Sequence, residues 1–393
     1  MLIGIDASRA VARERTGTEN YSLQLIRHLL ALDANHRYRL YFNQPPRPNL
    51  FPPSARAESR VMPFPRLWTH LRLSWEIARR SPDILFVPAH VLPLIHPRRS
   101  VVTVHDLGYL YYPRAHRPFD RWYLHWSTFY HVRAACHLIA DSQATRDDLI
   151  RHYRAVPERV TVVYPGCDEI FRPVTDANRL ARVKKRYGFR GDYVLHVGTL
   201  QPRKNLERLL EAFAHLDGEL QLVLAGKRGW LYDRIFRRVE ELGLGDRVLF
   251  AGHVPQEDLP ALMSGARLLA MPSLYEGFGL PVVEAMACGT PVVCSNASSL
   301  PEVAGDAALL VDPLDVEGMA AAMERVLGDD ELRAELIERG FERAKKFSWE
   351  RCARQTLAVL EKAGGLLGGE EEGVRGQDVH EDGDAGDDAG GGG

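Results

Sequence analysis

Short apolar runs alternate with amphipathic stretches along the first part of the chain. The apolar runs predict buried strands at residues 2–6, 38–42, 84–87, 101–104, 137–140 and 160–163. The amphipathic stretches predict helices between them, the clearest at residues 20–32, 119–135 and 143–153. Because strands that alternate with helices form parallel sheets covered on both faces, this part predicts an α/β domain.

The same alternation starts again after residues 164–173, a segment rich in turn-forming residues. It predicts a second set of strands at residues 193–197, 220–225, 248–250, 268–271 and 291–294. The helices predicted between them cover residues 205–214, 232–242, 259–266 and 281–287. The pattern therefore predicts two α/β domains joined by a linker, at residues 1–172 and 173–347.

Two further segments follow the second domain. Residues 348–363 have helical periodicity, and Ser348 is a good N-cap for that helix. Residues 364–393 are mostly Gly, Asp and Glu with almost nothing to bury, which predicts an acidic, Gly-rich, disordered tail.

Charge is spread unevenly over these segments, although the formal net charge of the chain is only −2. Residues 1–172 contain 24 Lys and Arg against 15 Asp and Glu, a net charge of +9, whereas residues 173–363 contain 25 against 28. The tail contains one Arg against nine acidic residues. A basic domain could meet anionic lipid head groups, phosphorylated acceptors or nucleic acid. An arginine-rich chain with no special surface would have the same composition.

Cysteine usage and the length of the apolar runs indicate in which cellular compartment the protein is found. The five cysteines are scattered and include no Cys-x-x-Cys pair, which argues against a disulfide framework and against a zinc site. No apolar run approaches the roughly 18 residues that cross a bilayer. The apolar start at residues 2–5 is too short for a signal peptide. We therefore expect a cytoplasmic protein of ordinary globular composition, 45% hydrophobic and 26% charged.

The segment 272–291 contains the strongest chemical signal. Glu276 follows a predicted strand, and the Gly-Phe-Gly sequence 277–279 leads into a helix that starts near Leu280. Exposed amides at a helix start bind anions, so a diphosphate is the expected ligand. Glu284 lies one turn inside the helix, where both carboxylates could accept hydrogen bonds from sugar or ribose hydroxyls. Taken singly, either glutamate could instead be a solvated residue favoured by the helix dipole.

The segment 195–206 presents two cations. A predicted strand ends at Gly198, and the loop after it carries Arg203 and Lys204 before a helix for which Asn205 is a good N-cap. Open α/β sheets bind ligands at the carboxyl ends of their strands, so these cations could neutralise a diphosphate leaving group. Alone, an Arg-Lys pair is more often a solvated surface pair.

Together these segments resemble the retaining glycosyltransferases of family 4, which have the GT-B fold. The resemblance covers the chain up to about residue 363, and its strongest part is the Glu-x7-Glu signature of Glu276 and Glu284. Further support comes from the sequences at residues 198–205, 222–226 and 250–255. The resemblance implies two Rossmann-like domains whose parallel sheets face each other across a cleft.

The resemblance also implies roles for individual residues. Glu276 would contact the donor sugar, Glu284 would bind the nucleotide ribose, and Arg203 and Lys204 would hold the diphosphate. The other implied donor-binding positions are Gly17, Val254, Gly277, Phe278, Gly279 and Leu280. Some members of the family have an Arg where this chain has Thr199, which puts one diphosphate contact in doubt.

The N-terminal domain would supply the opposite wall of the cleft. Gly17, in the segment 16–20, resembles the family's glycine loop, which faces donor and acceptor. His105 resembles a histidine that touches the transferred sugar, although a His at the end of a strand is often structural. The catalytic set implied by the resemblance is His105, Arg203, Lys204 and Glu276. Residues 348–363 resemble the family's crossover helix, which packs back on the N-terminal domain, and Ser142 is expected to cap the helix at 143–153.

Two other classes of enzyme lack their motifs. No Gly-x-Gly-x-x-Gly follows the first predicted strand, which argues against an NAD enzyme. Metal-dependent sugar transferases hold a divalent ion with an Asp-x-Asp motif. The only Asp-x-Asp in this sequence is formed by Asp382 and Asp384 in the tail, so we expect no metal, and we expect no cofactor either. Lys and Arg would then do the work that a metal ion does elsewhere.

The expected function is transfer of a hexosyl group to a hydroxyl of a glycan or lipid-linked acceptor. The resemblance implies retention by attack on the same face of the sugar. GDP-mannose is the first choice of donor and a UDP-sugar the second, and no nucleic-acid partner is expected. Aromatic and basic residues at 63–75 and 109–133 could dock on an anionic membrane, although ordinary helix packing explains them as well. A sugar-nucleotide 2-epimerase and a non-catalytic partner subunit of a transferase are the alternatives.

Overall fold

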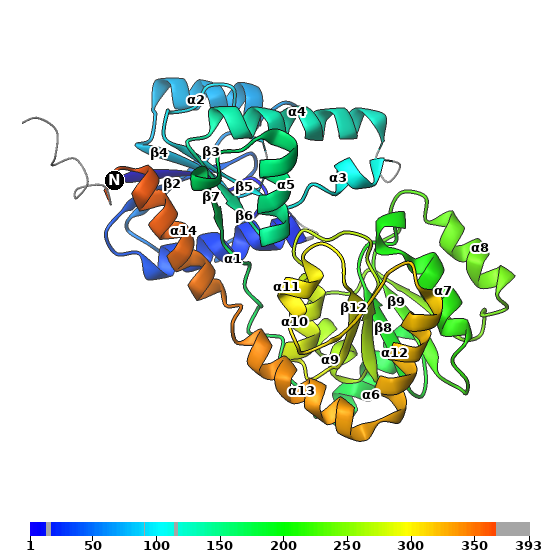
Figure 1. Ribbon diagram of the computed structural model, residues 1–393. Coiled ribbons are helices and arrows are strands. Elements are labelled where there is room, and N and C mark those ends of the chain that lie inside the picture. Colours follow the sequence, from blue (N-terminus) through cyan, green and yellow to red (C-terminus); the bar gives the residue numbers. More distant parts are fainter. Residues whose placement is uncertain (13–16, 90, 114–116, 367–393) are drawn as a thin grey trace, which may run out of the picture.

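The computed structural model describes residues 1–12, 17–89, 91–113 and 117–366, which form two lobes with one parallel sheet each (Figure 1). The strand order is β3-β2-β1-β4-β5-β6-β7 in the N-terminal lobe and β10-β9-β8-β11-β12-β13 in the C-terminal lobe. All the described strand pairs are parallel. The first six strands of each lobe follow the Rossmann order 3-2-1-4-5-6, which confirms the prediction of two Rossmann-like α/β domains.

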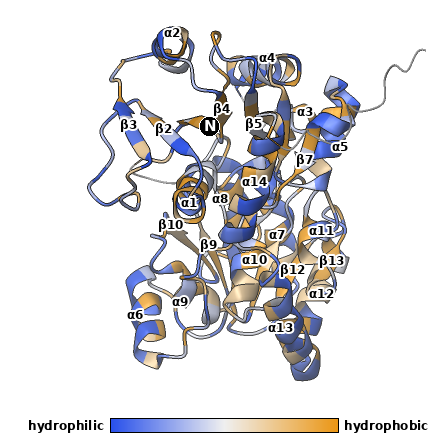
Figure 2. Cartoon of the chain, turned by 90° about the vertical axis from the view of Figure 1, so that its left-hand side faces the viewer, coloured by the Kyte–Doolittle hydropathy of each residue, from blue (hydrophilic) through white to orange (hydrophobic). Residues whose placement is uncertain are grey.

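The strands are short, and most are buried. The N-terminal sheet consists of β1 (Leu2–Asp6), β2 (Arg37–Phe42), β3 (Ala57–Val61), β4 (Ile84–Val87), β5 (Ser100–Val104), β6 (His137–Ala140) and β7 (Val160–Val162). The C-terminal sheet consists of β8 (Tyr193–Val197), β9 (Gln221–Ala225), β10 (Val248–Gly252), β11 (Leu268–Met271), β12 (Val292–Ser295) and β13 (Leu309–Val311). Inner strands are apolar on both faces, as a parallel sheet between helix layers requires, and Figure 2 shows them in orange.

Helices cover both faces of the N-terminal sheet. One face packs against α1 (Gly17–Leu32) and α14 (Trp349–Ala363). The elements on or beside the opposite face are η1 (Thr69–Leu73), α2 (Ser74–Arg79), α3 (Gly108–Tyr111), α4 (Pro118–Ala134), α5 (Gln143–Tyr153) and the turn η3 (Pro157–Arg159). The last described helix therefore completes the core of the first lobe.

The C-terminal sheet is covered in the same way. One face packs against α6 (Ala177–Tyr187), α9 (Leu259–Ser264), α10 (Leu280–Ala287) and α11 (Leu300–Ala304). The other face packs against α7 (Leu206–Ala214), α8 (Asp233–Glu241) and α12 (Val316–Gly328). Beyond α12, α13 (Asp330–Ala344) runs along the bottom of this lobe and leads up to α14 (Figure 1).

The chain crosses between the lobes twice, and the two crossings lie side by side. Cys167 N donates to the Phe347 carbonyl at 3.0 Å, and Cys167 forms an isolated parallel bridge with Ser348. Gly166 approaches the second crossing so closely that a Cβ there would lie 2.1 Å from Trp349 N. The Ser348 side chain accepts from Arg351 N, so its predicted role as N-cap of α14 is confirmed.

The elements that the sequence pattern missed lack regular apolar spacing. β3 is an edge strand, and each of its residues is at least partly exposed. α6 buries only Val183, and α13 buries only Leu336, Gly340 and Ala344, so charged residues dominate both sequences. Also unpredicted were η1, α2, α3, α11, α12 and β13. Residue 16 of the glycine loop and the tail from residue 367 lie outside the described residues.

Candidate active site

A cavity of about 510 Å³ lies between the lobes, where the carboxyl ends of both sheets meet. All the residues that the sequence analysis assigned to donor binding or catalysis line it: Gly17, His105, Arg203, Lys204, Val254, Glu276, Gly277, Phe278, Gly279, Leu280 and Glu284. The individual roles stay predictions, but their convergence in one cavity is observed. Open α/β sheets bind ligands at this edge, so the cavity is the candidate active site.

The cavity contains a buried ion cluster. Glu276 accepts hydrogen bonds from Lys204 Nζ at 2.6 Å and from Arg203 Nη1 at 3.0 Å. Glu276 and Lys204 are only 6% and 7% exposed. Burial opposes ionisation of Glu276, but the two cations outweigh it and lower the pKa of this carboxyl to about 2. The cluster therefore holds one negative and two positive charges at neutral pH.

Two turns at neighbouring strands bring these side chains together. Arg203 and Lys204 belong to η4 (Pro202–Lys204), which follows β8, and Glu276 lies in the loop that follows β11. Ser298 Oγ accepts from Glu276 N at 2.8 Å, and Ser299 Oγ donates to the Glu276 carbonyl at 3.0 Å. The backbone of Glu276 is thus held on both sides by the segment that leads into α11. No sequence signal pointed to these two serines.

Asn205 does not act as the side-chain N-cap that the sequence predicted. Its backbone is left-handed, with φ of 58°, and its side chain makes no cap hydrogen bond. Instead, its Nδ2 donates to the carbonyl oxygens of Pro313 at 2.6 Å and Pro272 at 3.1 Å. Asparagine tolerates the left-handed region better than most residues, so it can turn the chain from η4 into α7. Its amide then ties η4 to the loop that carries Glu276.

The start of α10 also faces the cavity. Gly279 is its N-cap, with φ of 103°, a conformation that glycine adopts at little cost. Pro281 occupies the first turn, where a helix tolerates proline. Ser299 Oγ donates to the Phe278 carbonyl at 2.8 Å and fixes the approach to the helix. Amides in a first helical turn lack partners within the helix and favour an anion, so this end of the cavity suits a phosphate.

Glu284, further along α10, lines the same cavity in a different charge state. Burial, with a smaller contribution from the Asp168 carboxylate, raises the pKa of Glu284 to about 8. Its carboxyl group is therefore mostly protonated at neutral pH. Glu276 is ionised because it has two cationic partners, and Glu284 has none among the described residues.

His105 follows β5 and forms part of the N-terminal wall. Its Nδ1 donates to Asp141 Oδ2 at 2.6 Å, and its Nε2 donates to the Pro88 carbonyl at 2.9 Å. Burial opposes charge on the ring, but the Asp141 carboxylate outweighs it and raises the pKa of His105. Both nitrogens face acceptors, so the surroundings of the ring favour its protonated form. Ser142 caps α5 by accepting from Thr145 N, as predicted.

A tyrosine next to Glu276 joins the two lobes. Tyr275 Oη donates to Asp148 Oδ2 on α5 at 2.7 Å. Tyr111, from α3, donates to the other oxygen of Asp148 and stacks on Tyr275 with ring centroids 5.2 Å apart. These three residues, which we call the Tyr275 clasp, fasten the loop of Glu276 to the N-terminal lobe. The clasp was not predicted, because its parts lie far apart in the sequence.

Two further contacts hold the lobes together beside the clasp. Glu302 on α11 accepts from the backbone amides of Gln143 at 2.9 Å and Ala144 at 3.0 Å, at the start of α5. Gly277 approaches the N-terminal lobe so closely that a Cβ there would lie 2.1 Å from the His105 carbonyl oxygen. Gly277 is therefore required for the close approach of the lobes, in addition to its predicted place near the donor.

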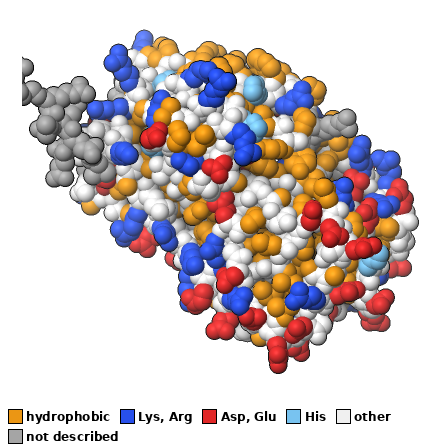
Figure 3. All heavy atoms as spheres, viewed as in Figure 1, with side chains coloured by type: hydrophobic (Ala, Val, Ile, Leu, Met, Phe, Trp, Pro, Cys, Tyr) orange, Lys and Arg blue, Asp and Glu red, His pale blue; other side chains and the backbone are white. Residues whose placement is uncertain are grey.

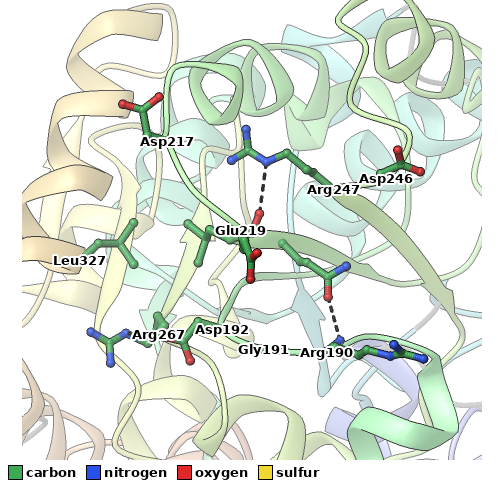
Figure 4. A pocket seen from close by; sticks show the side chains of 11 residues that line it. Arg190, Gly191, Asp192, Asp217, Glu219, Asp246, Arg247, Arg267 and Leu327 are labelled. Carbon is green, nitrogen blue, oxygen red and sulfur yellow. Dashed lines mark hydrogen bonds and ion pairs between the residues drawn. The ribbon is translucent and has the colours of Figure 1, made fainter.

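A groove of about 690 Å³ at the opposite edge of the C-terminal sheet has a different character (Figure 4). It is lined at the amino ends of the strands by charged residues of both signs. Arg247 donates there to the carbonyls of Leu216 and Leu220, and Arg267 lies 3.7 Å from Asp192. Arg247, Arg267 and Asp192 already have partners, and the groove lies at the edge of the sheet away from the interlobe cavity.

Replacing Tyr275 by Phe is expected to loosen the lobes. The change removes one donor from Asp148, which is only 7% exposed, and should cost about 1–3 kcal/mol. Small-angle X-ray scattering should give a larger radius of gyration for Tyr275→Phe than for the wild type. Tyr187→Phe is the matched control, because Tyr187 donates to Asp258 at 2.8 Å within the C-terminal lobe. Equal radii for the two variants would show that the clasp does not hold the lobes closed.

Comparison with known proteins agrees with this geometry. Residues 182–343 match the family described as Glycosyl transferases group 1, and residues 15–170 match Glycosyltransferase Family 4. O-antigen chain mannosyltransferase B of Escherichia coli is 34% identical over 374 residues, which cover 90% of this chain and 98% of that protein.

Two solved structures share the fold at lower identity. Sucrose-phosphate synthase from Thermosynechococcus elongatus has a TM-score of 0.72 and 24% identity, over 92% of this chain and 98% of that one. The Anabaena protein HepE, solved with UDP-glucose, has a TM-score of 0.71 and 19% identity, over 92% of this chain and 99% of that one. The two-lobed fold and these matches show that the chain belongs to glycosyltransferase family 4 and is a mannosyltransferase-like glycosyltransferase of the GT-B type.

Proposed function

We propose that the protein transfers a mannosyl group from GDP-mannose to a hydroxyl of a glycan or lipid-linked acceptor, with retention of configuration and without a metal. The observation that carries this proposal is the buried cluster of Glu276, Arg203 and Lys204 beside the start of α10. The choice of mannose is supported by the similarity to the E. coli mannosyltransferase over nearly all of its length. The choice of a nucleotide-sugar donor is supported by the fold shared with HepE.

The cluster has the charge that a sugar diphosphate needs. Arg203 and Lys204 supply two positive charges, of which Glu276 neutralises one. A bound diphosphate takes Arg203 and Lys204 as its partners, which frees the Glu276 carboxylate to accept hydroxyls of the donor sugar. Negative charge grows on the diphosphate as the bond to the sugar breaks, and the cations and the α10 amides stabilise it. These groups supply the charge that a metal ion supplies in other transferases.

The state of the carboxyl groups supports attack on the same face of the sugar. Among the described residues, four carboxyl groups line the cavity: Asp106, Asp141, Glu276 and Glu284. Asp141 is held by His105, Glu276 is held by two cations, and Asp106 accepts from Gly108 N at 2.9 Å. Glu284 is mostly protonated at neutral pH because of its raised pKa. None is therefore an unpaired carboxylate ready to form a covalent glycosyl intermediate, and the leaving diphosphate is the proposed acceptor of the proton from the attacking hydroxyl.

A ligand screen followed by a transfer assay tests this function. GDP-mannose should raise the melting temperature more than UDP-, ADP- or dTDP-sugars do, because a ligand stabilises the state that binds it. Glu276→Gln should lower kcat/KM by about 100- to 1,000-fold, as loss of one preorganised charge contact does. The matched control is Glu317→Gln on the exposed start of α12, which should leave the rate unchanged.

The same assay separates the parts of the proposal. An unchanged rate in excess chelator supports metal independence, and a rate lost and then restored by magnesium or manganese rejects it. An α-linked product from the α-linked donor, seen by NMR, supports retention, and a β-linked product rejects it. Full activity of Glu276→Gln would remove the central role of the cluster.

Nucleotide affinity should depend on pH through Glu284. We propose that its ionised form accepts the ribose hydroxyls, whereas burial keeps it protonated in the free enzyme, with a pKa of about 8. At pH 7 about a tenth of the carboxyl groups with this pKa are ionised, and at pH 9 most of them are. GDP affinity should therefore rise by roughly tenfold between pH 7 and pH 9. Isothermal titration calorimetry from pH 6.5 to 9 measures this rise. Glu284→Gln should flatten the profile, and an equal rise in that variant would assign the effect to another group.

The N-terminal lobe also has a surface suited to an anionic membrane. None of the described helices has both the length and the apolar character needed to span a bilayer. α2 and α4 lie together at the top of this lobe, where Phe119 is 71% and Trp122 60% exposed (Figures 1 and 3). Arg72 and Arg79 lie 4.9 and 4.1 Å from the Trp75 ring. Exposed aromatics with arginines are typical of interfacial docking, so we propose that the lobe contacts the inner face of the membrane.

Vesicle flotation tests this contact. The protein should float with vesicles that contain anionic phosphatidylglycerol and stay behind with pure phosphatidylcholine, because the expected attraction is partly electrostatic. Replacing Phe119 and Trp122 by Ser should reduce the floated fraction several-fold. Leu314→Ser is the control, since Leu314 is 61% exposed on the other lobe. Equal flotation of the double variant and the control would reject this surface.

A further inference from the structure

The N-terminal lobe contains a second cavity of about 430 Å³ at the carboxyl edge of its sheet. We call it the side cavity; its walls include Arg9, Asn43, Trp68, His70 and Tyr123. It opens where β1, β2 and β3 end, whereas the interlobe cavity is bordered by the ends of β1, β5 and β6 in this lobe. Its volume falls within the roughly 300–1,000 Å³ of small-molecule sites.

Described residues on either side of residues 13–16 line the two cavities. Ser8, Arg9 and Ala12, which follow β1, line the side cavity, and Gly17 and Thr18, at the start of α1, line the interlobe cavity. Arg9 Nη1 also lies 3.5 Å from Glu19 Oε1 on α1. Because Thr18 and Asn20, the neighbours of Glu19, line the interlobe cavity, this contact joins the walls of the two cavities, and a ligand with several units could extend from one to the other.

The backbone of the side cavity is unusual. Leu67 has φ of 55°, a conformation in which a side chain with Cβ is strained. The next residues enter η1, a π-helix, which is a rare element often found at functional sites. Leu67, Trp68, Thr69 and His70 all line the cavity, so both irregularities occur in its wall. Strain of this kind persists where surrounding structure enforces it, frequently at ligand sites.

Polar atoms of the wall lack partners. Asn43 Oδ1 and His70 Nδ1 are buried and make no hydrogen bond within the described part of the chain. His70 Nε2 lies 3.0 Å from Tyr123 Oη, and burial lowers the pKa of His70, so its ring is neutral near pH 7. Buried polar groups are nearly always paired in proteins, with protein groups or with ordered water, so these two atoms are open to hydrogen bonds with a bound molecule or with water.

The composition of the wall selects the ligand class. The described lining residues combine the rings of Trp68, His70 and Tyr123 with the neutral amides of Asn43 and Gln44, and they include no carboxylate. The positive charge of Arg9 is opposed by Glu19. Aromatic faces with neutral donors and acceptors suit a neutral, polyhydroxylated molecule better than a phosphate or an acyl chain.

We propose that the side cavity binds a sugar residue of the acceptor chain that does not react, while the residue that receives mannose lies in the interlobe cavity. This inference rests on the proposed function. It makes the enzyme a transferase for oligosaccharide acceptors, with Asn43 as a residue that determines specificity for acceptor length. Binding energy from the remote sugar would hold the reacting hydroxyl in position.

The test compares acceptors of different length. With GDP-mannose as donor, the probes are methyl α-mannoside and linear α-mannotriose. Wild-type kcat/KM should be at least about tenfold higher for the trisaccharide than for methyl α-mannoside. In Asn43→Ala the ratio of these two kcat/KM values should fall by about tenfold. Activity on methyl α-mannoside and slow hydrolysis of the donor should stay unchanged in Asn43→Ala. Asn178→Ala, on the exposed start of α6, is the matched control and should behave as the wild type.

Other outcomes would overturn the inference. Equal use of both acceptors by the wild type, or an equal loss on both in Asn43→Ala, would show that the side cavity binds no remote sugar. If GDP-mannose neither binds nor reacts, the proposed function fails instead. Saturation-transfer NMR of α-mannotriose with the protein free of nucleotide then decides: no signal, or the same signal in a folded Asn43→Ala and in a second variant, Gln44→Ala, overturns the side cavity as a sugar site.

Discussion

The pairing of Glu276 with Lys204 and Arg203 is the interaction around which the C-terminal half of the cleft is arranged. Burying three charged groups is costly unless each is paired, and removing one partner leaves an unpaired charge in a dry site. The strands that carry them, β8 and β11, are neighbours in the sheet, so the cluster also fixes the loops at their ends. Ser298, Ser299 and the amide of Asn205 hold those loops from the outside. The cluster carries one more positive than negative charge and so attracts an anion.

This arrangement extends into the other lobe. Tyr275, the residue before Glu276, reaches Asp148, and Gly277, the residue after it, lies against the His105 carbonyl. A glutamate flanked on both sides by interlobe contacts has its backbone position set by the contact between the lobes. The donor-binding role proposed for Glu276 would couple donor binding to lobe closure through three consecutive residues, with no need for a long pathway. Closure also excludes the water that would hydrolyse an activated sugar.

The sequence predicted the architecture well, because buried parallel strands are continuous apolar runs with little ambiguity. It missed β3, an exposed edge strand, and α13, whose three buried residues do not make a clear apolar stripe. For the site, positions at the ends of strands pointed to the two cations and the two glutamates, whereas Gly17, His105 and Val254 were predicted from the resemblance to family 4.

What the sequence could not supply was the partner of each side chain. Asn205 had the residue type of a cap, but its side chain bonds across to two proline carbonyls. Tyr275 and Asp148 are 127 positions apart, and no periodicity joins them. Glu276 is ionised and Glu284 is mostly protonated because their burial and their neighbours in space differ. Their spacing of eight residues in the sequence gives no information on either.

The place of α14 in the N-terminal core has a consequence for synthesis. Trp349, Cys352 and Leu360 pack with residues of β1 and α1, so the first lobe lacks part of its core until the ribosome has made α14, the last of the described helices. Among the described residues, the cores of the C-terminal lobe end at Phe347, so that lobe can be completed earlier. Domains are usually finished in the order in which they are translated. Here the C-terminal lobe can be completed before the N-terminal lobe. The apolar face of the N-terminal lobe that α14 covers stays exposed while the C-terminal lobe is being synthesised.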